Sequence, residues 1–237
     1  SSDLDNKPDA IQKLKEATEQ TVIKIAILKT KYPQGSEKQL IESVIGLEIP
    51  LGGLPSDVGV AMSNVGTMAI VGRAIIKESP LTHRVISVSG RGINQPKNLF
   101  VPIGISIDEV IKFCGGLTKD AARVVAGGPM MGFSFSDFST PVTKGTSGIT
   151  VLTHDEIKSD EETSCIRCGR CVDACPMNLV PTRLALAARY NNTSIASQYH
   201  IHACFECGCC SYVCPAKINL VQLIRTGKKL AAASQNL

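Results

Sequence analysis

Nine of the ten cysteines lie between Cys165 and Cys214, and eight of these nine form two copies of one spacing. The first copy, C-x-x-C-x-x-C-x-x-x-C-P, ends at Pro176, and the second runs from Cys204 to Pro215. Three thiolates at two-residue gaps can wrap one face of a cubane cluster, and the fourth cysteine of such a run ligates the other cluster of a pair. The spacing therefore predicts two [4Fe–4S] clusters and electron transfer.

Each predicted cluster takes three cysteines from one copy and the last cysteine of the other copy. The ligands expected for the first cluster are Cys165, Cys168, Cys171 and Cys214. Those expected for the second cluster are Cys204, Cys207, Cys210 and Cys175. Both copies are needed to complete either cluster.

Zinc is the main alternative, because C-x-x-C pairs can hold tetrahedral zinc and His200 and His202 precede the second copy. Eight thiolates in two fourfold repeats, each closed by Cys-Pro, exceed what zinc requires, so we favour clusters and expect both histidines to be solvated or capping. Cys209 directly precedes Cys210, and we expect its side chain to point away from the cluster as a free thiol. We expect Cys114 to be a buried thiol at a helix end.

The cysteine copies need helices to hold them together. A helical pattern over 181–190 lies between the copies, and a second one over 221–230 follows them. Two loops and two helices of this kind can pack around two clusters. We therefore expect an α-helical module over residues 161–237.

The N-terminal part reads as two strand–turn–helix units. After a helix over 8–17, a buried strand is expected over 22–28 and a helix from Ser36, with Gln39 as its capping-box partner, to Gly46. The second unit has a strand over 58–62 and a helix over 64–77. Such turns direct backbone N–H groups of a helix start toward an anion or a flavin phosphate, although an ordinary strand-to-helix turn would look the same. This part is expected to be an α/β layer.

The middle of the chain predicts a small α+β module. Strands are expected over 84–90, 98–103 and 123–126, and Ser106 opens a short helix with a capping box. Residues from about 134 to 162 mix Ser, Thr, Asp and Gly with short apolar pieces. We interpret them as connecting structure.

Composition restricts the class of protein. The chain is 43% hydrophobic and 19% charged, which suits a folded globular protein, and its net charge of +4 is scattered along the sequence. Nucleic-acid binding is therefore not expected, since it requires a basic footprint. The charge-free stretch Val58–Gly72 contains polar residues and is too short to span a bilayer, and the N-terminus lacks the pattern of a signal peptide. We expect no transmembrane segment and a reducing cytoplasmic setting.

The whole chain resembles the C-terminal portion of the RnfC/RsxC subunit of Rnf-type membrane electron-transport complexes. The resemblance rests on both cysteine motifs and on five further segments, which are Lys31–Gly35, Gly52–Pro55, Asn64–Thr67, Gly127–Gly132 and Thr143–Gly148. It implies an α/β remnant of an FMN/NADH-binding domain over 1–81 and a ubiquitin-like SLBB domain over 82–133. A connecting segment over 134–160 and a dicluster ferredoxin domain over 161–237 follow.

The α/β part is also similar to the flavin subunit of respiratory complex I. Residues 30–38 match a Gly-Ala-Tyr-x-x-Gly-Glu-Glu-Thr turn of that family, and residues 63–67 match an Asn-Asn-Val-Glu-Thr segment. By this resemblance the flavin- or NADH-contacting residues are Tyr32, Gly35, Glu37, Asn64 and Thr67. Ser36, Ser63 and Gly66 depart from the family's pattern.

The resemblance implies an electron-transfer subunit of an ion-translocating ferredoxin:NAD⁺ oxidoreductase. Its cofactors would be two [4Fe–4S] clusters, with FMN and NAD(H) in the full-length subunit. Its partners would be other membrane-complex subunits and, indirectly, ferredoxin, and it would lie peripherally on the cytoplasmic face of the bacterial membrane. The family's glycine-rich flavin segment has no counterpart here, so this chain alone is not expected to be catalytically complete. Alternatives are the iron–sulfur subunit of a heterodisulfide-reductase-like or glycolate-oxidase-like enzyme, and a stand-alone dicluster carrier.

Overall fold

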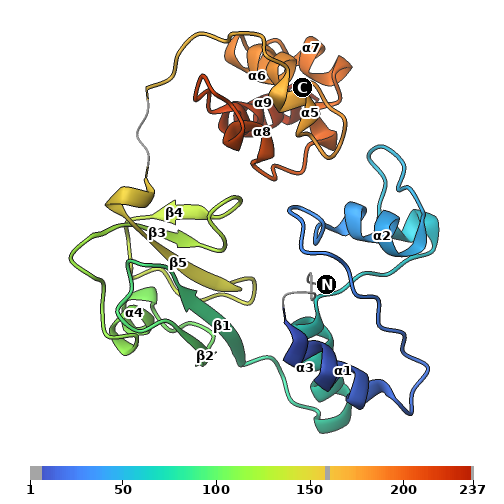
Figure 1. Cartoon of the computed structure of the whole chain (residues 1–237), viewed down its shortest axis with the longest axis vertical. Helices are drawn as coiled ribbons and strands as arrows, with labels where there is room; N and C mark the ends of the chain where they lie inside the picture. The colour runs from blue at the N-terminus through green and yellow to red at the C-terminus, as the bar shows by residue number, and fades with distance from the viewer. Residues whose placement is uncertain (1–6, 158–160, 236–237) are drawn as a thin grey trace. The chain divides into compact units, whose positions relative to one another are not determined.

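The computed structural model describes residues 7–157 and 161–235 of the chain. The chain divides into two compact units, residues 1–69 and residues 70–237. The second unit holds a β-sheet and a group of helices, which are shown in green to yellow and in orange to red (Figure 1).

The first unit is built from helices. Helix α1 spans Pro8–Thr18, α2 spans Glu37–Ile45, a 3-10 turn spans Pro55–Val58, and α3 (Val65–Lys77) continues into the second unit. The three predicted helices are thus confirmed. Gly46 ends α2 as expected, because its left-handed conformation lets its N–H bond to the carbonyl of Glu42. The prediction of a capping box is wrong, since Ser36 makes no side-chain cap hydrogen bond.

The two strands expected in this unit are absent from the described residues. Residues 22–28 and 58–62 form no ladder, and Val22 and Ile23 are 98% and 62% exposed. A β-branched run becomes a strand only where a neighbouring strand pairs with it, and the described part of this unit provides none. The prediction of strands over 22–28 and 58–62 is therefore wrong.

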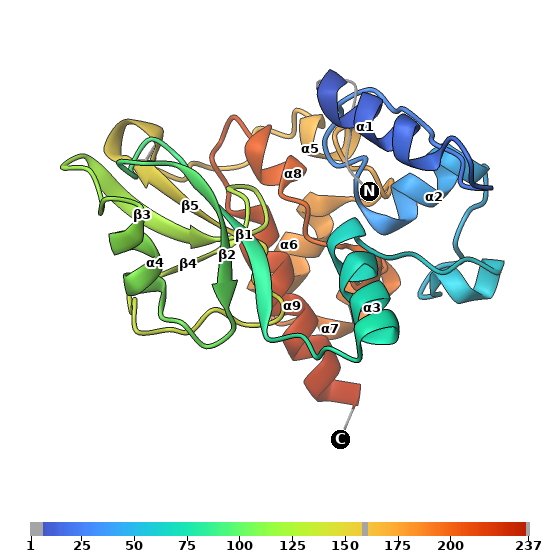
Figure 2. The same cartoon turned by 90° about the horizontal axis from the view of Figure 1, so that it is seen from below.

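A five-stranded sheet forms the first part of the second unit. Its strands are β1 (His83–Ser89), β2 (Lys97–Pro102), β3 (Ala121–Ala126), β4 (Phe133–Phe135) and β5 (Gly148–Thr153). They lie in the order β2-β1-β5-β3-β4, and all pairs are antiparallel except β1 with β5. Helix α4 (Ile107–Phe113) packs against the sheet (Figures 1 and 2). This hairpin, helix and central parallel pair make the ubiquitin-like arrangement that was expected.

Strand β5 corrects the interpretation of residues 134–160 as connecting structure. It is the central strand, parallel to β1 on one side and antiparallel to β3 on the other, and a short 3-10 turn, His154–Glu156, follows it. Its side chains alternate, with Ile149, Val151 and Thr153 buried. The sequence did not predict this strand, because its neighbourhood is rich in Gly and Thr. A strand here forms by pairing with residues far away in the sequence.

The sheet and α4 enclose one apolar core. The main buried side chains are Ile86, Val88, Val110, Ile111, Val124, Ile149 and Val151. Helix α4 is capped as predicted, because the Ser106 hydroxyl accepts the N–H of Glu109 at 3.2 Å. Cys114 is fully buried at the end of this helix, as expected. Burial raises the pKa of its thiol, although the charge of Lys97 opposes the rise.

The C-terminal part is helical. It contains α5 (Arg170–Asp173), α6 (Pro181–Arg189), α7 (Thr193–Gln198), a 3-10 turn (Ile201–Ala203), α8 (Cys209–Tyr212) and α9 (Leu220–Gln235). Helices α6 and α9 confirm the two predicted helices. They pack together with α7 around Leu184, Ile201 and Ile224, which are almost completely buried (Figure 2).

Candidate functional site

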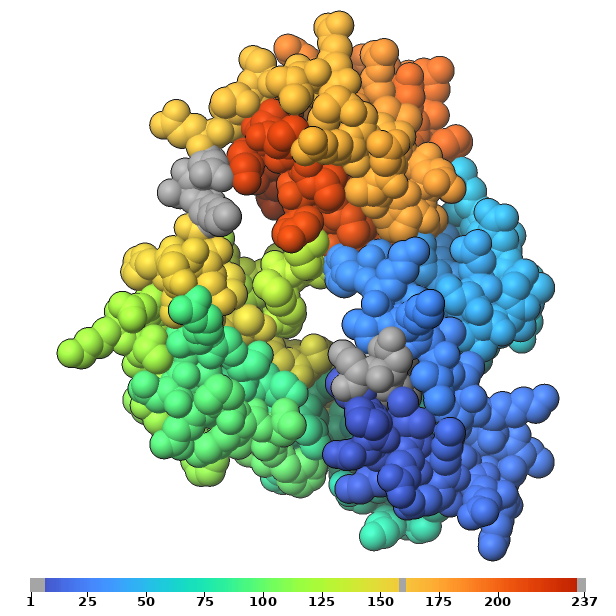
Figure 3. All heavy atoms as spheres, viewed as in Figure 1, coloured from blue at the N-terminus to red at the C-terminus, as the bar shows by residue number. Residues whose placement is uncertain are grey.

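The two cysteine copies fold into the same local structure. In each copy a left-handed glycine, Gly169 or Gly208, precedes a one-turn helix, α5 or α8. Each short helix carries the third cysteine of its copy, Cys171 or Cys210, and both are buried. Helices α5 and α8 are in contact, and residues of both copies, amber and red, lie side by side on one face in Figure 3.

Cysteines from both copies line one cavity. Cys175, the last cysteine of the first copy, lies there with Cys204, Cys207 and Cys210 of the second copy. The rest of the lining is mostly apolar, with Pro176, Leu179, Pro181, Leu184, Val221 and Ile224. A set of four thiols in an apolar surrounding has the donor chemistry that a [4Fe–4S] cluster requires.

Backbone N–H groups point at two of these sulfurs. The N–H of Leu179 donates to Sγ of Cys175 at 3.4 Å, and the N–H of Glu206 donates to Sγ of Cys204 at 3.4 Å. Glu206 can do so because its backbone is left-handed, with φ of 63°. Hydrogen bonds to sulfur favour the thiolate form that ligates iron. These two N–H groups therefore suit sulfurs that bind a cluster.

Burial opposes ionisation in this cavity. It raises the pKa of Cys207 to about 11, and burial together with the charges of neighbouring thiolates, Cys175 included, raises that of Cys210 to about 12. For Cys204, burial also raises the pKa, while the N–H of Glu206 and the charge of Lys228 act in the opposite direction. Burial thus favours the protonated form of Cys207 and Cys210, and a metal that binds here has to displace their protons.

Three of the four cysteines expected around the first cluster also lie close together. Burial raises the pKa of Cys171, and the charges of Cys214 and Cys168 raise it further. Cys171 and Cys214 pack in one apolar group with Cys210, whereas Cys165 and Cys168 are exposed. This set is thus more open to solvent than the other one.

Cys209 does not point away from the cavity, and that expectation is wrong. It lines the cavity, and its side chain makes a hydrogen bond with Cys207 that raises the pKa of that thiol. Cys209 directly follows Gly208, which has a left-handed backbone. The cavity of the second copy therefore contains five thiols rather than four.

The arrangement of the side chains does not separate the zinc alternative from the clusters. Among residues 7–157 and 161–235, no group of three or more His, Cys, Asp and Glu side chains is arranged to hold a single metal ion. His200 and His202 are exposed, in line with the expectation that they are solvated.

The residues assigned to flavin lie at two helix starts of the first unit. Tyr32 and Gly35 belong to the turn before α2 and Glu37 is its first residue, while Asn64 and Thr67 flank the start of α3. Asn64 is held in place, because its side-chain oxygen accepts the N–H of Gly66 at 2.9 Å. The backbone N–H groups in the first turn of a helix suit an anionic group such as a phosphate.

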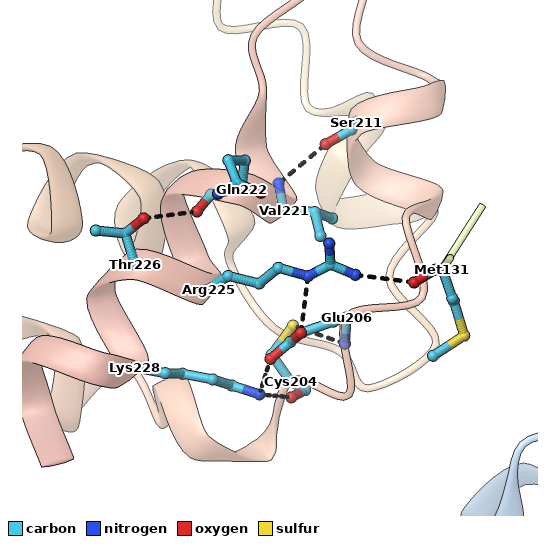
Figure 4. Close-up of polar contacts among 9 residues, drawn as sticks. All are labelled: Met131, Cys204, Glu206, Ser211, Val221, Gln222, Arg225, Thr226 and Lys228. Atoms are coloured by element: carbon cyan, nitrogen blue, oxygen red, sulfur yellow. Dashed lines mark hydrogen bonds and ion pairs between the residues drawn. The ribbon is translucent and has the colours of Figure 1, made fainter. Parts of the chain in front are cut away.

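Three charged residues beside the second copy were not found from the sequence. Glu206, inside the second cysteine copy, binds both Arg225 and Lys228 of α9 (Figure 4). Nothing in the motif marks them, because the two cations lie beyond the last cysteine. Only the packing of α9 against the loop brings them together.

No helix in the described ranges has both the length and the apolar composition needed to cross a bilayer.

Three protein-family models match separate parts of the chain. The Nuo51 FMN-binding domain matches residues 4–73, the SLBB domain matches residues 85–134, and the 4Fe-4S dicluster domain matches residues 164–218. The expected combination of a flavin-domain portion, a ubiquitin-like module and a dicluster module is confirmed. The domain boundaries given above stay a prediction.

Several curated proteins are similar to most of this chain. The C subunit of the proton-translocating ferredoxin:NAD(+) oxidoreductase complex of Clostridium ljungdahlii is 47% identical over 77% of this chain and 40% of its own length. Its counterpart in the Na(+)-translocating complex of Acetobacterium woodii is 42% identical over 79% of this chain and 42% of its own length. The counterpart in the ion-translocating oxidoreductase complex of Vibrio cholerae is 38% identical over 78% of this chain and 24% of its own length. The chain thus spans less than half the length of these relatives.

Proposed function

We propose that this chain, which is homologous over three quarters of its length to the C subunit of Rnf-type ion-translocating complexes, is an electron-transfer part of such a subunit. In this function it passes electrons between NAD(H) with FMN and partner subunits, by way of two [4Fe–4S] clusters. The whole assembly would act as a ferredoxin:NAD⁺ oxidoreductase that moves Na⁺ or H⁺. Bound clusters supply one-electron transfer, and the chain supplies their ligands and surroundings.

The observation that carries the proposal is the meeting of both cysteine copies in one cavity. Cys175 lies with three cysteines of the second copy, and Cys214 lies near Cys171 of the first copy. Such crossing is the arrangement in which the fourth cysteine of each run ligates the other cluster. We therefore propose Cys165, Cys168, Cys171 and Cys214 as ligands of one cluster, and Cys204, Cys207, Cys210 and Cys175 as ligands of the other.

The flavin part of the proposal rests on two helix starts and on the match to the Nuo51 FMN-binding domain. We propose that the turn with Tyr32, Gly35 and Glu37 and the segment with Asn64 and Thr67 contact FMN or NADH in the full-length subunit. The helix starts would supply N–H groups, and the Thr67 hydroxyl would supply a further donor.

The proposal for partners and location is supported by the same similarity. We propose that the chain docks on other subunits of a membrane electron-transport complex, peripherally on the cytoplasmic face. The more open first cysteine set, with Cys165 and Cys168 exposed, supports this part of the module as the docking face, because electron transfer needs short paths.

Anaerobic purification with iron and flavin assays tests this function. The chain should contain about eight iron atoms and show two [4Fe–4S] signals on reduction, because two cubanes hold about four iron atoms each. A chain with full cysteine content but zinc in place of iron would contradict the proposal. Flavin bound to the full-length subunit would support the FMN part, and a flavin-free full-length subunit that still carries both clusters would favour the dicluster carrier.

A further inference from the structure

Glu206 is at the centre of a half-buried charge network beside the second cysteine copy. Its carboxylate accepts hydrogen bonds from Nε of Arg225 and from Nζ of Lys228, each at 2.8 Å (Figure 4). The three side chains are only 26%, 18% and 21% exposed, in that order. Water therefore screens these charges much less than it screens surface ion pairs.

Lys228 and Glu206 both contact a proposed ligand directly. Lys228 Nζ donates to the backbone carbonyl of Cys204, and the N–H of Glu206 donates to Sγ of the same cysteine. The charge of Lys228 also reaches this sulfur, where it acts against the rise in pKa that burial causes. One cation and one anion are thus fixed beside one sulfur.

Arg225 keeps the carboxylate in place from the other side. Its Nη2 donates to the carbonyl of Met131 at 3.2 Å, and its guanidinium lies 4.8 Å from the centre of the Phe133 ring. Arg225 therefore has anchors besides Glu206, and Lys228 has the Cys204 carbonyl. Both cations can stay in place if the carboxylate is neutralised.

Within residues 7–157 and 161–235, the first cysteine copy shows no such arrangement at the matching position. Arg167 occupies the place of Glu206 and has the same left-handed backbone, with φ of 56° against 63°. It is exposed to solvent. The repeated motif thus carries opposite charges at equivalent positions, and among the described residues only the second copy has its charge paired with α9.

We propose that Lys228 and Glu206 set the reduction potential of the cluster held by the second cysteine copy. Reduction adds a negative charge to a cluster, so a fixed cation close to Cys204 favours the reduced state and a fixed anion opposes it. Glu206 acts here through its own negative charge, since Lys228 is also anchored by the carbonyl of Cys204. The inference rests on the proposed function, in that it requires this copy to ligate a cluster.

The experiment compares two variants that remove opposite charges from one ion pair. Lys228→Gln should lower one of the two midpoint potentials by about 59 mV. For one electron this shift is about a tenfold change in the equilibrium constant for reduction. Glu206→Gln should raise the same midpoint potential. Lys229→Gln is the matched control, because it removes a charge from the neighbouring residue of α9, and both midpoint potentials should stay unchanged. Lys228→Arg should keep the midpoint potential of the native protein.

Iron content and redox titration by electron paramagnetic resonance are measured on the complete chain. Shifts of the same sign in Lys228→Gln and Glu206→Gln, or an equal shift in Lys229→Gln, would overturn the inference. If Lys228→Gln loses its cluster, Glu206→Gln decides: a raised potential with full iron supports the inference, and an unchanged one overturns it. Absence of iron from the unmodified chain would instead contradict the proposed function.

Discussion

Cys175 and Cys210 come from different copies of the cysteine motif, yet they line one cavity. Burial raises the pKa of Cys210 to about 12, and the negative charge of Cys175 contributes to this rise. The charge interaction requires the end of the first copy to lie beside the middle of the second. A substitution in one copy should therefore damage the centre built mainly by the other copy.

Cys175→Ala should disrupt the cluster proposed for Cys204, Cys207 and Cys210, and Cys214→Ala should disrupt the other cluster. Each variant should lose up to about four iron atoms or convert one centre to a three-iron form, because one ligand of a cubane is missing. Iron analysis with electron paramagnetic resonance measures the outcome. Cys114→Ser is the control, since Cys114 lies in the core of the sheet. If Cys175→Ala keeps two complete [4Fe–4S] centres, crossed ligation is wrong.

Cys209→Ser should leave the iron content unchanged. The cavity already holds four proposed ligands from the two copies, so Cys209 is a fifth thiol in contact with Cys207. Anaerobic reconstitution followed by iron analysis measures the effect, with Cys207→Ser as the positive control that should impair its cluster. A loss of about four iron atoms from Cys209→Ser, the content of one cubane, would show that Cys209 and not a neighbour is the ligand.

Gly90→Ala should destabilise the sheet much more than Gly104→Ala. Both glycines have positive φ, 105° and 99°, so both substitutions strain the backbone by about 1–3 kcal/mol. Only at Gly90 would the new Cβ also lie 2.1 Å from the carbonyl oxygen of Val151, whereas Gly104 has open space. The additional clash should cost about 1–3 kcal/mol, measured as a difference in the free energy of unfolding. Equal losses in the two variants would show that β5 does not pass so close to Gly90.

Thr67→Ala in the full-length subunit should weaken FMN binding by about tenfold. The side chain stands at the start of α3, and one lost hydrogen bond to a charged ligand costs about 1.5 kcal/mol or more. Titration of flavin-free protein with FMN measures the affinity. Ser56→Ala is the control, because it removes an exposed hydroxyl of the same unit without touching a proposed contact. Equal affinities in both variants would remove Thr67 from the flavin site.

The sequence by itself determined the parts that depend on local spacing. The helical periods predicted α6 and α9, which the structure contains. The cysteine intervals predicted two crossed ligand sets, which stay a prediction. Ser106 predicted the start of α4 because a cap is satisfied within one turn of helix. Gly46 predicted the end of α2 for the same local reason.

Only the tertiary structure decided the features that join distant residues. Residues 22–28 looked like a buried strand but form none, and β5 looked like a connection but is the central strand, because strand formation depends on partners rather than on composition. Likewise, Cys209 lines a cavity that forms only when Cys175 and Leu179 pack beside the second copy. Glu206 gains its two cations only where α9 packs on the second cysteine copy. Periodicity and spacing carry local geometry, whereas pairing, burial and charge contacts arise from residues that the chain brings together when it folds.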